Sequence, residues 1–338
     1  MKQHEFNSLK KNLFIEGEAI TQDQFEEAET HTSYILLTRN FAFKIKKSVN
    51  LPFLDFSTLA QREFFCRREL FLNRRLAPEI YLDVCQLRQY NEAYEIGGSQ
   101  GELIDYAVKM KRMDNSREMD QLLKNKQLNN QHIMQLAEVI SRFHVDAFAI
   151  NKVFSLEKMR DTFNQIASWQ KFAKEHLGNK WEKLIAEAVR YSDRFLEQHI
   201  DELNQRSRLG LVRDVHGDLH SQNIFIFEKP VIFDCLEFDD DLRQIDLMNE
   251  VAFFMMDLEY WNAEDLARSF LHHYDRLMHQ AGMEQAVNKS LLRYFMLYRA
   301  TVKAKVNFIK ADHAEGEQDE EAIKNSRRYL ELCEKYLE

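Results

Sequence analysis

The chain has 338 residues, of which 45% are hydrophobic and 30% are charged, the proportions of a globular protein with a sizeable core. Its formal net charge of −9 argues against a nucleic-acid binder, because such proteins usually carry a basic excess. The longest apolar stretch, residues 251–256, is far shorter than the ~20 residues of a membrane span, and the amino-terminal segment lacks an apolar signal core. The four cysteines form no CxxC pair, which indicates reduced thiols. We therefore expect a cytoplasmic protein that binds neither nucleic acid nor membranes.

The first third of the chain is typical of β-structure. Residues 33–38 (SYILLT) and 41–46 (FAFKIK) are rich in apolar residues and are separated by two residues, which predicts a hairpin. Successive side chains of a strand point to opposite faces, so Lys44 and Lys46 share one face of the second strand while Phe43 lies on the other. The scarcity of glycine (9) and proline (3) argues against long flexible linkers.

A helix is predicted to begin near Thr58. Thr58 and Gln61 have the spacing of a capping box, and Pro78 marks the far end of the helical segment. A second group of strands is expected at residues 93–113, with three glycines at its turn.

After residue 113 the pattern is helical almost everywhere. Helices are predicted over residues 131–148, 156–174 and 181–206, and again from residue 242 to the end. The exception is residues 209–234, which alternate between loop and short strands. The sequence therefore predicts an α+β protein with two lobes, a β-rich lobe at residues 1–110 and a helical lobe at residues 111–338, joined by a hinge near residues 111–115.

The most specific feature is the segment HGDLHSQN at residues 216–223, followed by Asp234 at the end of an apolar strand. Phosphoryl transfer needs a carboxylate that accepts the proton of the attacking hydroxyl and oxygen ligands that hold Mg²⁺ against the nucleotide phosphates. Asp218 and Asn223, five positions apart, supply a base and a metal ligand from one loop, and Asp234 supplies a second ligand. This spacing matches the kinase pattern H-x-D-x-x-x-x-N.

HGDLHSQNI followed by VIFD resembles the catalytic signature of the aminoglycoside phosphotransferase and choline kinase superfamily. THTSYILL, FKIKKSV, FLDFSTL, LNRRLAPEIY and FDCLEFDDDLRQID resemble, more narrowly, a bacterial family of aminoglycoside-phosphotransferase-like proteins of undefined substrate. The resemblance covers residues 30–305 and implies a protein-kinase-like two-lobe fold. Some members carry an additional carboxy-terminal P-loop kinase domain. The chain contains no G-x-x-x-x-G-K-[ST] motif, so we expect the stand-alone form.

The resemblance implies a role for each residue of this signature. Asp218 corresponds to the catalytic base, and Asn223 and Asp234 correspond to the Mg²⁺ ligands. His216 corresponds to the residue that braces the catalytic loop against the metal-binding segment. Asp246 corresponds to a buried aspartate that hydrogen-bonds the backbone of the catalytic loop.

In the first lobe, Ala42-Phe43-Lys44 resembles the A-x-K of the nucleotide-binding strand, so Lys44 is expected to contact the α- and β-phosphates. Lys46 shares its face and is the alternative. A glutamate on the next helix should pair with this lysine, and Glu69 fits the register of the family, with Glu63 as the alternative.

The Gly-rich loop that covers the phosphates in protein kinases has no counterpart before Ser33. The hydroxyls and backbone N–H groups of Thr32 and Ser33 stand in the corresponding place and are candidate phosphate ligands.

Several other charged residues admit two interpretations. Glu237 and the three aspartates at 239–241 form either a solvated acidic loop or a further contact to Mg²⁺ or substrate, with Glu237 the best candidate. Arg299, Lys303 and Lys310 share a helix face that is either solvated or lines the substrate cleft and favours an anionic substrate. His216 and His220 have the spacing of a zinc pair, but that pair requires a helix and this segment is predicted to be a loop.

These observations predict an ATP-dependent O-phosphotransferase that uses Mg²⁺ and acts on a hydroxyl of a small molecule, with ATP between the lobes. A small-molecule acceptor is favoured over a protein because no activation-loop segment is evident. The alternatives are a nucleotide-binding regulatory pseudokinase and a protein kinase. The choice between ATP and GTP, the identity of the acceptor and the oligomeric state do not follow from the sequence.

Overall fold

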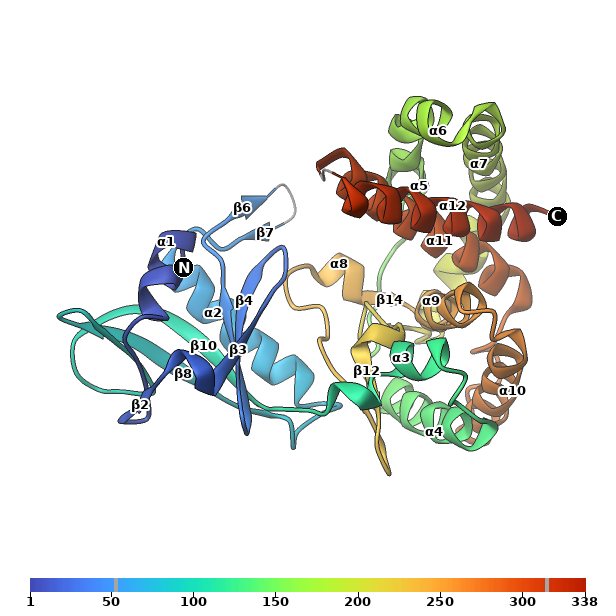
Figure 1. Cartoon of the computed structure of the whole chain (residues 1–338). Coiled ribbons are helices and arrows are strands. Elements are labelled where there is room, and N and C mark those ends of the chain that lie inside the picture. The colour runs from blue at the N-terminus through green and yellow to red at the C-terminus, as the bar shows by residue number, and fades with distance from the viewer. Residues whose placement is uncertain (52–53, 314–315) are drawn as a thin grey trace. The chain divides into compact units, whose positions relative to one another are not determined.

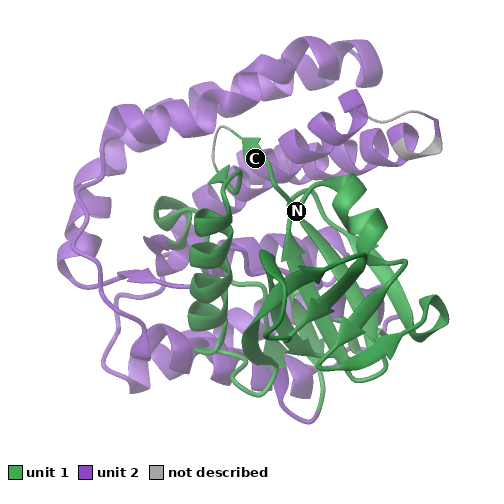
Figure 2. Ribbon diagram, turned by 90° about the vertical axis from the view of Figure 1, so that its left-hand side faces the viewer, with its two compact units in different colours: residues 1–118, 223–227, 231–243 green, residues 119–222, 228–230, 244–338 purple. Residues whose placement is uncertain are grey.

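The computed structural model describes residues 1–51, 54–313 and 316–338 (Figure 1). The chain divides into two compact units, shown in separate colours in Figure 2. Unit 1 consists of Met1–Glu118, Asn223–Phe227 and Val231–Arg243, and unit 2 consists of Met119–Gln222, Glu228–Pro230 and Gln244–Glu338. The first boundary lies eight residues beyond the predicted end of the β-rich lobe, and unit 1 also takes two segments from the region that the sequence assigns to the helical lobe. The segment HGDLHSQN therefore contributes Asp218 to unit 2 and Asn223 to unit 1.

Unit 1 is built on an eight-stranded sheet with the order β2-β1-β9-β8-β10-β5-β4-β3. The predicted hairpin is present, since β4 and β5 pair antiparallel with Leu36 opposite Phe43. Within this sheet β1 and β9 pair in parallel and the other neighbours pair antiparallel. The strands of the sheet are β1 Leu13–Ile15, β2 Glu18–Ile20, β3 Phe25–Glu29, β4 Ser33–Thr38, β5 Phe41–Lys46, β8 Tyr81–Tyr90, β9 Ala93–Ile96 and β10 Glu102–Lys111.

Shorter elements complete unit 1. They are helix α1 Gln3–Leu9, the pair β6 Asn50–Leu51 and β7 Leu54–Asp55, the pair β12 Ile224–Ile226 and β13 Pro230–Ile232, and helix α8 Asp240–Arg243. The ten-residue strand β8 was not predicted from the sequence. Its burial pattern mixes both faces, so the simple alternation that indicates a strand is lost.

Both faces of β5 are covered. Phe43 and Ile45 are fully buried in one apolar cluster with Leu36 and Leu87. Ala42 belongs to a second cluster on the other face. Lys44 and Lys46 share this second face, which places two ammonium groups inside the unit.

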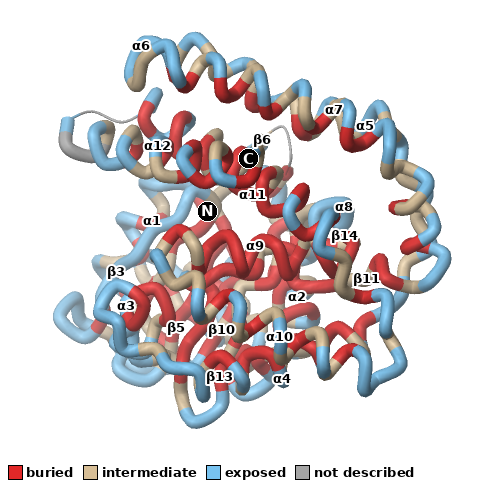
Figure 3. Tube along the Cα trace, turned by 90° about the vertical axis from the view of Figure 1, so that its right-hand side faces the viewer, coloured by how far each residue is buried: buried red, intermediate tan, exposed pale blue. Residues whose placement is uncertain are grey.

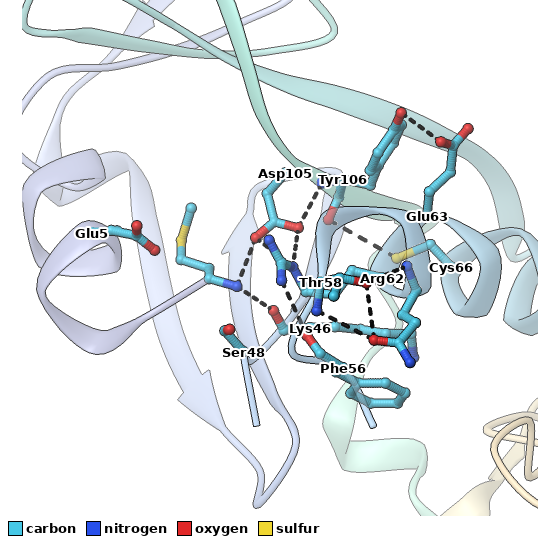
Figure 4. A network of polar contacts seen from close by, with 12 residues as sticks. Glu5, Lys46, Ser48, Phe56, Thr58, Arg62, Glu63, Cys66, Asp105 and Tyr106 are labelled. Atoms are coloured by element: carbon cyan, nitrogen blue, oxygen red, sulfur yellow. Dashed lines mark hydrogen bonds and ion pairs between the residues drawn. The ribbon is translucent and has the colours of Figure 1, made fainter. Parts of the chain in front are cut away.

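Helix α2, Leu59–Asn73, lies on that second face, in contact with β10 and β8. The predicted capping box is present, because Thr58 Oγ1 accepts a hydrogen bond from the Gln61 N–H at 3.2 Å. The helix ends at Asn73, before Pro78. Buried ion pairing fixes its position, since Arg62 Nε lies 2.8 Å from Asp105 Oδ1 on β10 (Figure 4). In the same view Glu63 accepts a hydrogen bond from the Tyr106 hydroxyl at 2.8 Å.

Unit 2 is mainly helical and also contains the short antiparallel pair β11 and β14. Helix α9 is buried along most of its length, as the tube in Figure 3 shows. None of the described helices combines the length and apolar character that a membrane crossing requires. The elements are α3 Met119–Lys124, α4 Asn130–Asp146, α5 Leu156–Asn164, α6 Gln170–Leu177, α7 Asn179–Arg208, β11 Val212–Asp214, β14 Gln244–Asp246, α9 Leu247–Tyr260, α10 Glu264–Gln280, α11 Lys289–His313 and α12 Glu317–Leu337.

Two helix predictions in unit 2 are wrong in detail. The helix predicted over residues 156–174 is interrupted by a 3₁₀ segment, Gln165–Trp169. There the Trp169 ring stacks on Phe308 of α11, with 5.9 Å between centroids, and packing overrides helical propensity. The region from residue 242, predicted to be helical throughout, contains the strand β14, because its partner β11 lies about thirty residues earlier.

The buried pair between Arg62 and Asp105 should dominate the stability of the α2 attachment. Replacing Arg62 by Met leaves the buried Asp105 carboxylate with the Met1 ammonium group, at 2.6 Å, as its remaining ion-pair partner, and we expect a loss of about 1 to 3 kcal/mol in the free energy of unfolding. The matched control is Arg67→Met on the same helix, whose pair with Glu63 is exposed and should matter by less than about 1 kcal/mol. Urea denaturation of both variants measures this, and equal losses would contradict the assignment.

Candidate active site

Unit 1 contains a buried charge cluster centred on Glu69. Lys44 and Lys46 project from β5 toward α2, and Glu69 projects from α2 between them. Lys44 Nζ lies 2.9 Å from Glu69 Oε1, and Lys46 Nζ lies 2.7 Å from Glu69 Oε2. The two residues that the sequence pairs, Lys44 and Glu69, are therefore in contact, and the alternative lysine binds the other oxygen of the same carboxylate. Glu63, the alternative glutamate, is held by Tyr106.

The segment after β13 adds two carboxylates to this cluster. Asp234 Oδ1 lies 2.6 Å from Lys44 Nζ, and Glu237 Oε1 lies 2.5 Å from Lys46 Nζ. The side chain of Asp234 is 40% exposed, whereas the side chains of Lys46 and Glu237 are 1% and 8% exposed. Glu237 is thus a buried ion-pair partner rather than part of a solvated acidic loop. Lys44, at the accessible side, is better placed than Lys46 to meet a ligand.

Burial and charge act in opposite directions on these groups. Burial opposes the charge on Lys44, but the carboxylates of Asp234 and Glu69 outweigh it and raise the pKa of Lys44 well above its ordinary value. Burial likewise disfavours an ionised Glu69, yet Lys44 and Lys46 together lower the pKa of Glu69 below its ordinary value. The pKa of Glu237 is raised, first by burial, because Lys46 only partly offsets that cost.

The backbone around Asp234 is held in an unusual conformation. Asp234 has φ of 60°, in the left-handed region that costs energy for a residue with a side chain. Its N–H donates to the Tyr81 hydroxyl at 3.2 Å, the Cys235 N–H donates to Asn73 Oδ1 at 2.8 Å, and the Phe233 N–H donates to the Asn223 carbonyl at 3.0 Å. These contacts fix the direction in which the Asp234 carboxylate leaves the chain.

The oxygens of Asn223 and Asp234 are hard ligands of the kind that Mg²⁺ prefers, and the exposed part of Asp234 leaves it accessible. The residues present therefore fit the predicted metal. Within residues 1–51, 54–313 and 316–338, no three His, Cys, Asp or Glu side chains are grouped to hold a metal by themselves, and His216 and His220 make no zinc site there.

In unit 2 the catalytic-type loop is held by helix α9. Glu250 accepts hydrogen bonds from the N–H groups of His216 at 3.1 Å and Gly217 at 2.6 Å. Glu250 also contacts His144 Nε2 at 3.0 Å, and Asp257 accepts the Ser221 N–H at 2.8 Å. Burial disfavours the Glu250 charge, but the His144 contact and the other donors lower the pKa of Glu250 below its ordinary value.

The structure gives Glu250 the contact that the sequence assigns to Asp246. The Asp246 carboxylate is bound by Arg206, with Nε at 2.7 Å from Oδ2, and it caps α9 by accepting the Met248 N–H at 2.8 Å. Asp246 is a buried structural residue that acts at the helix start. The sequence signal for Glu250 and Asp257 was available, since two acids seven positions apart in an otherwise apolar helix lie on one face.

The side chain of Asp218 is 42% exposed. Its carboxylate lies 3.3 Å from His220 Nε2, and its N–H donates to His216 Nδ1 at 3.3 Å. Burial alone would raise the pKa of Asp218, but His220, Lys303 and His216 hold it well below its usual range. Asp218 is therefore ionised and accessible, as a proton acceptor must be.

Four other predicted site residues have defined surroundings. Arg299 is buried, and its Nε donates to Asn249 Oδ1 at 2.7 Å, whereas Lys303 is half-buried. Thr32 is half-buried and Ser33 is buried, and the Ser33 N–H already donates to Thr30 Oγ1 at 3.0 Å. The proposed phosphate contact of Thr32 and Ser33 stays a prediction.

Replacing Glu250 by Gln should loosen the loop. The amide group offers one acceptor oxygen where the carboxylate offers two, so one buried N–H loses its partner at a cost of about 1 to 3 kcal/mol. We expect faster hydrogen exchange in residues 216–222, measured by mass spectrometry. Glu259→Gln on the same helix is the control, because the Glu259 carboxylate binds Lys335 and Tyr336. An unchanged rate of hydrogen exchange in the Glu250 variant would refute the claim that Glu250 holds this loop.

No protein-family model matches the chain. Uncharacterized proteins of Mycobacterium tuberculosis (Rv2004c) and Mycobacterium bovis (Mb2027c) are each 28% identical over 337 residues. The alignment covers 94% of this chain and 61% of each relative, so the chain spans about three fifths of the length of the curated relatives it matches.

Solved structures give a clearer comparison of fold. Choline kinase from Cryptosporidium parvum has a TM-score of 0.55 at 13% identity, covering 94% of this chain and 91% of its own. A glucosamine kinase in complex with glucosamine, ADP and inorganic phosphate scores 0.50 at 13% identity, covering 92% and 75%. Plasmodium vivax ethanolamine kinase scores 0.50 at 10% identity, covering 92% and 82%. The chain has an α+β, kinase-like two-lobe fold similar to that of these three solved kinases.

Proposed function

We propose that this protein transfers the γ-phosphate of Mg-ATP to a hydroxyl group of a small molecule. The observation that carries the proposal is the position of Lys44, which binds Glu69 of α2 and Asp234 of the β12–β13 segment at once. A strand lysine paired with a helix glutamate, next to an aspartate that can hold a metal, is the arrangement that phosphoryl transfer requires around the nucleotide phosphates.

Unit 1 supplies the groups that face the nucleotide. Lys44 is the candidate for the α- and β-phosphates, because it is the accessible lysine of the cluster and Lys46 is enclosed. Asn223 and Asp234 are the candidates that hold Mg²⁺, which when bound neutralises charge on the transferring phosphoryl group. Glu69 orients Lys44 and keeps it protonated.

Unit 2 supplies the base. Asp218 orients the acceptor hydroxyl and receives its proton while the hydroxyl oxygen bonds to the γ-phosphorus and the bond to the β-phosphate oxygen breaks. Asp218 and Asn223 are five residues apart in one segment, so their Cα atoms are at most about 18 Å apart. Glu250 and Asp257 keep this segment from shifting by holding its N–H groups.

A small-molecule acceptor is supported by the three similar structures, which are a choline, a glucosamine and an ethanolamine kinase. We place the reaction in the cytoplasm, a location in keeping with four buried cysteines that form no disulfide.

The first test replaces the base. Asp218→Asn keeps the shape of the side chain and removes its ability to accept a proton, so we expect turnover to fall by roughly 10²- to 10⁴-fold. Phosphorylated products are measured by mass spectrometry after incubation of a metabolite extract with Mg-ATP, and ATP affinity is measured by calorimetry. Affinity should change less than about threefold. Asp146→Asn, at the surface of unit 2, is the control. Full turnover in the Asp218 variant would exclude this residue as the base.

The second test separates Lys44 from an ordinary structural lysine. Lys44→Met removes a charge-assisted contact to the phosphates, and we expect kcat/KM for ATP to fall roughly tenfold to a hundredfold. Lys109→Met is the matched control, because Lys109 on the neighbouring strand β10 contacts Phe41 and Glu16 instead. An unchanged ATP dependence in the Lys44 variant would remove this residue from the nucleotide site.

A further inference from the structure

Three basic side chains of unit 2 gather around one aromatic ring next to the candidate base. The Arg299 guanidinium lies 4.7 Å from the centre of the Phe253 ring, and Lys303 Nζ lies 5.7 Å from it. The His220 ring lies 5.2 Å from the same centre and reaches Asp218 at 3.3 Å. Phe253 comes from α9 and the two cations come from α11. The surroundings of Asp218 are therefore built by two helices and the loop.

The cations differ in what they are free to bind. Arg299 is buried and engaged, with hydrogen bonds to Asn249 Oδ1 at 2.7 Å and the Gly217 carbonyl at 3.4 Å. Lys303 is half-buried, and across the described ranges its ammonium group makes no hydrogen bond or ion pair. Lys303 acts on the Asp218 carboxylate electrostatically, without a hydrogen bond or ion pair to it across the described residues, so its ammonium group, held over an aromatic ring, is suited to receive an anion from solution.

Two acids lie near these cations. Asp218 carries one negative charge and interacts electrostatically with both Lys303 and Arg299. Glu250 accepts hydrogen bonds from two loop N–H groups and contacts His144. Arg299 and Lys303 thus place two positive charges beside the candidate base.

We propose that the phosphate acceptor is an anionic alcohol, a molecule that carries a phosphate or carboxylate group bound by Lys303 and a hydroxyl group oriented by Asp218. The inference rests on the proposed function for the meaning of Asp218. Arg299 contributes fixed positive charge, and the Phe253 ring provides the apolar surface between the two ends of the acceptor. A cationic acceptor would meet two like charges at this place, which disfavours binding.

The direct test is a binding measurement. Glycerol 3-phosphate, glycerate, glycerol and ethanolamine are titrated by calorimetry at low ionic strength into protein saturated with Mg-ADP, so that the nucleotide site is filled. We expect glycerol 3-phosphate or glycerate to bind and glycerol and ethanolamine to bind at least tenfold more weakly. A difference between the two anions identifies which anionic group the site prefers. Absence of binding by both anions, or tighter binding of ethanolamine, overturns the proposal.

Variants of α11 test whether Lys303 binds the anionic group. Lys303→Met should weaken anion binding at least tenfold, and Lys303→Arg should restore most of it. The control is Lys305→Met, which removes the same charge about 200° further around the helix, where Lys305 contacts Gln165. Thermal unfolding of each variant verifies that it is folded. Equal anion affinity in wild type and Lys303→Met overturns the assignment.

The outcomes separate this inference from the proposed function. A protein that phosphorylates only neutral or amine-bearing alcohols keeps the phosphotransferase function and loses the anion site. A protein that binds the anions through Lys303 and never turns over ATP keeps the site and loses the function.

Discussion

The carboxylate of Glu69 is completely enclosed and shared by two lysines, and unit 1 is organised around this contact. A buried carboxylate is costly unless it is paired, so β5, which carries both lysines, and α2, which carries the glutamate, are held in one register. The same lysines then bind Asp234 and Glu237, which ties the segment after β13 to the sheet. A single strand thereby aligns Lys44 with Asp234, the two residues that we propose contact the nucleotide and the metal.

The cluster also has two sides with different accessibility. Lys46 and Glu237 are enclosed and form the inner pair, whereas in the outer pair Lys44 is 11% and Asp234 is 40% exposed, so solvent reaches the outer pair through Asp234. The strained backbone of Asp234 fits this division, since such conformations persist where the surrounding contacts over-determine them. The enclosed pair of Lys46 and Glu237 holds the segment in place, and the more exposed pair of Lys44 and Asp234 is the one that a ligand can reach.

Unit 2 also contains buried carboxylates, and here backbone N–H groups stabilise them. Glu250 and Asp257 accept hydrogen bonds from N–H groups of the loop that carries Asp218. Because α9 holds the loop through its backbone N–H groups, the Asp218 carboxylate stays accessible. The cations near it, Arg299 and Lys303, come from a different helix, α11. This separation explains how one fold can serve acceptors of different charge, because a shared fold does not determine the groups that line the site. The three similar structures are a choline, a glucosamine and an ethanolamine kinase, whereas we propose that the cations near Asp218 favour an anionic acceptor in this chain.

The sequence predicts those features that depend on residues close together in the chain. The β4–β5 hairpin, the Thr58 cap and the spacing of Asp218, Asn223 and Asp234 follow from period, capping chemistry and motif, which act over a few residues. The contact between Lys44 and Glu69 was expected from the family register. The partner of Glu237 was not, because Lys46 lies 191 positions away and many acids compete for it in the sequence.

The contacts of Glu250 with the catalytic-type loop and the break in the predicted helix at Gln165–Trp169 both depend on tertiary packing. Glu250 is paired with the His216 N–H and Trp169 with the Phe308 ring only in the folded chain. Local patterns specify which elements form and which chemistry they carry. Only packing specifies which buried charge meets which partner, because the cost of burying a charge depends on everything that surrounds it.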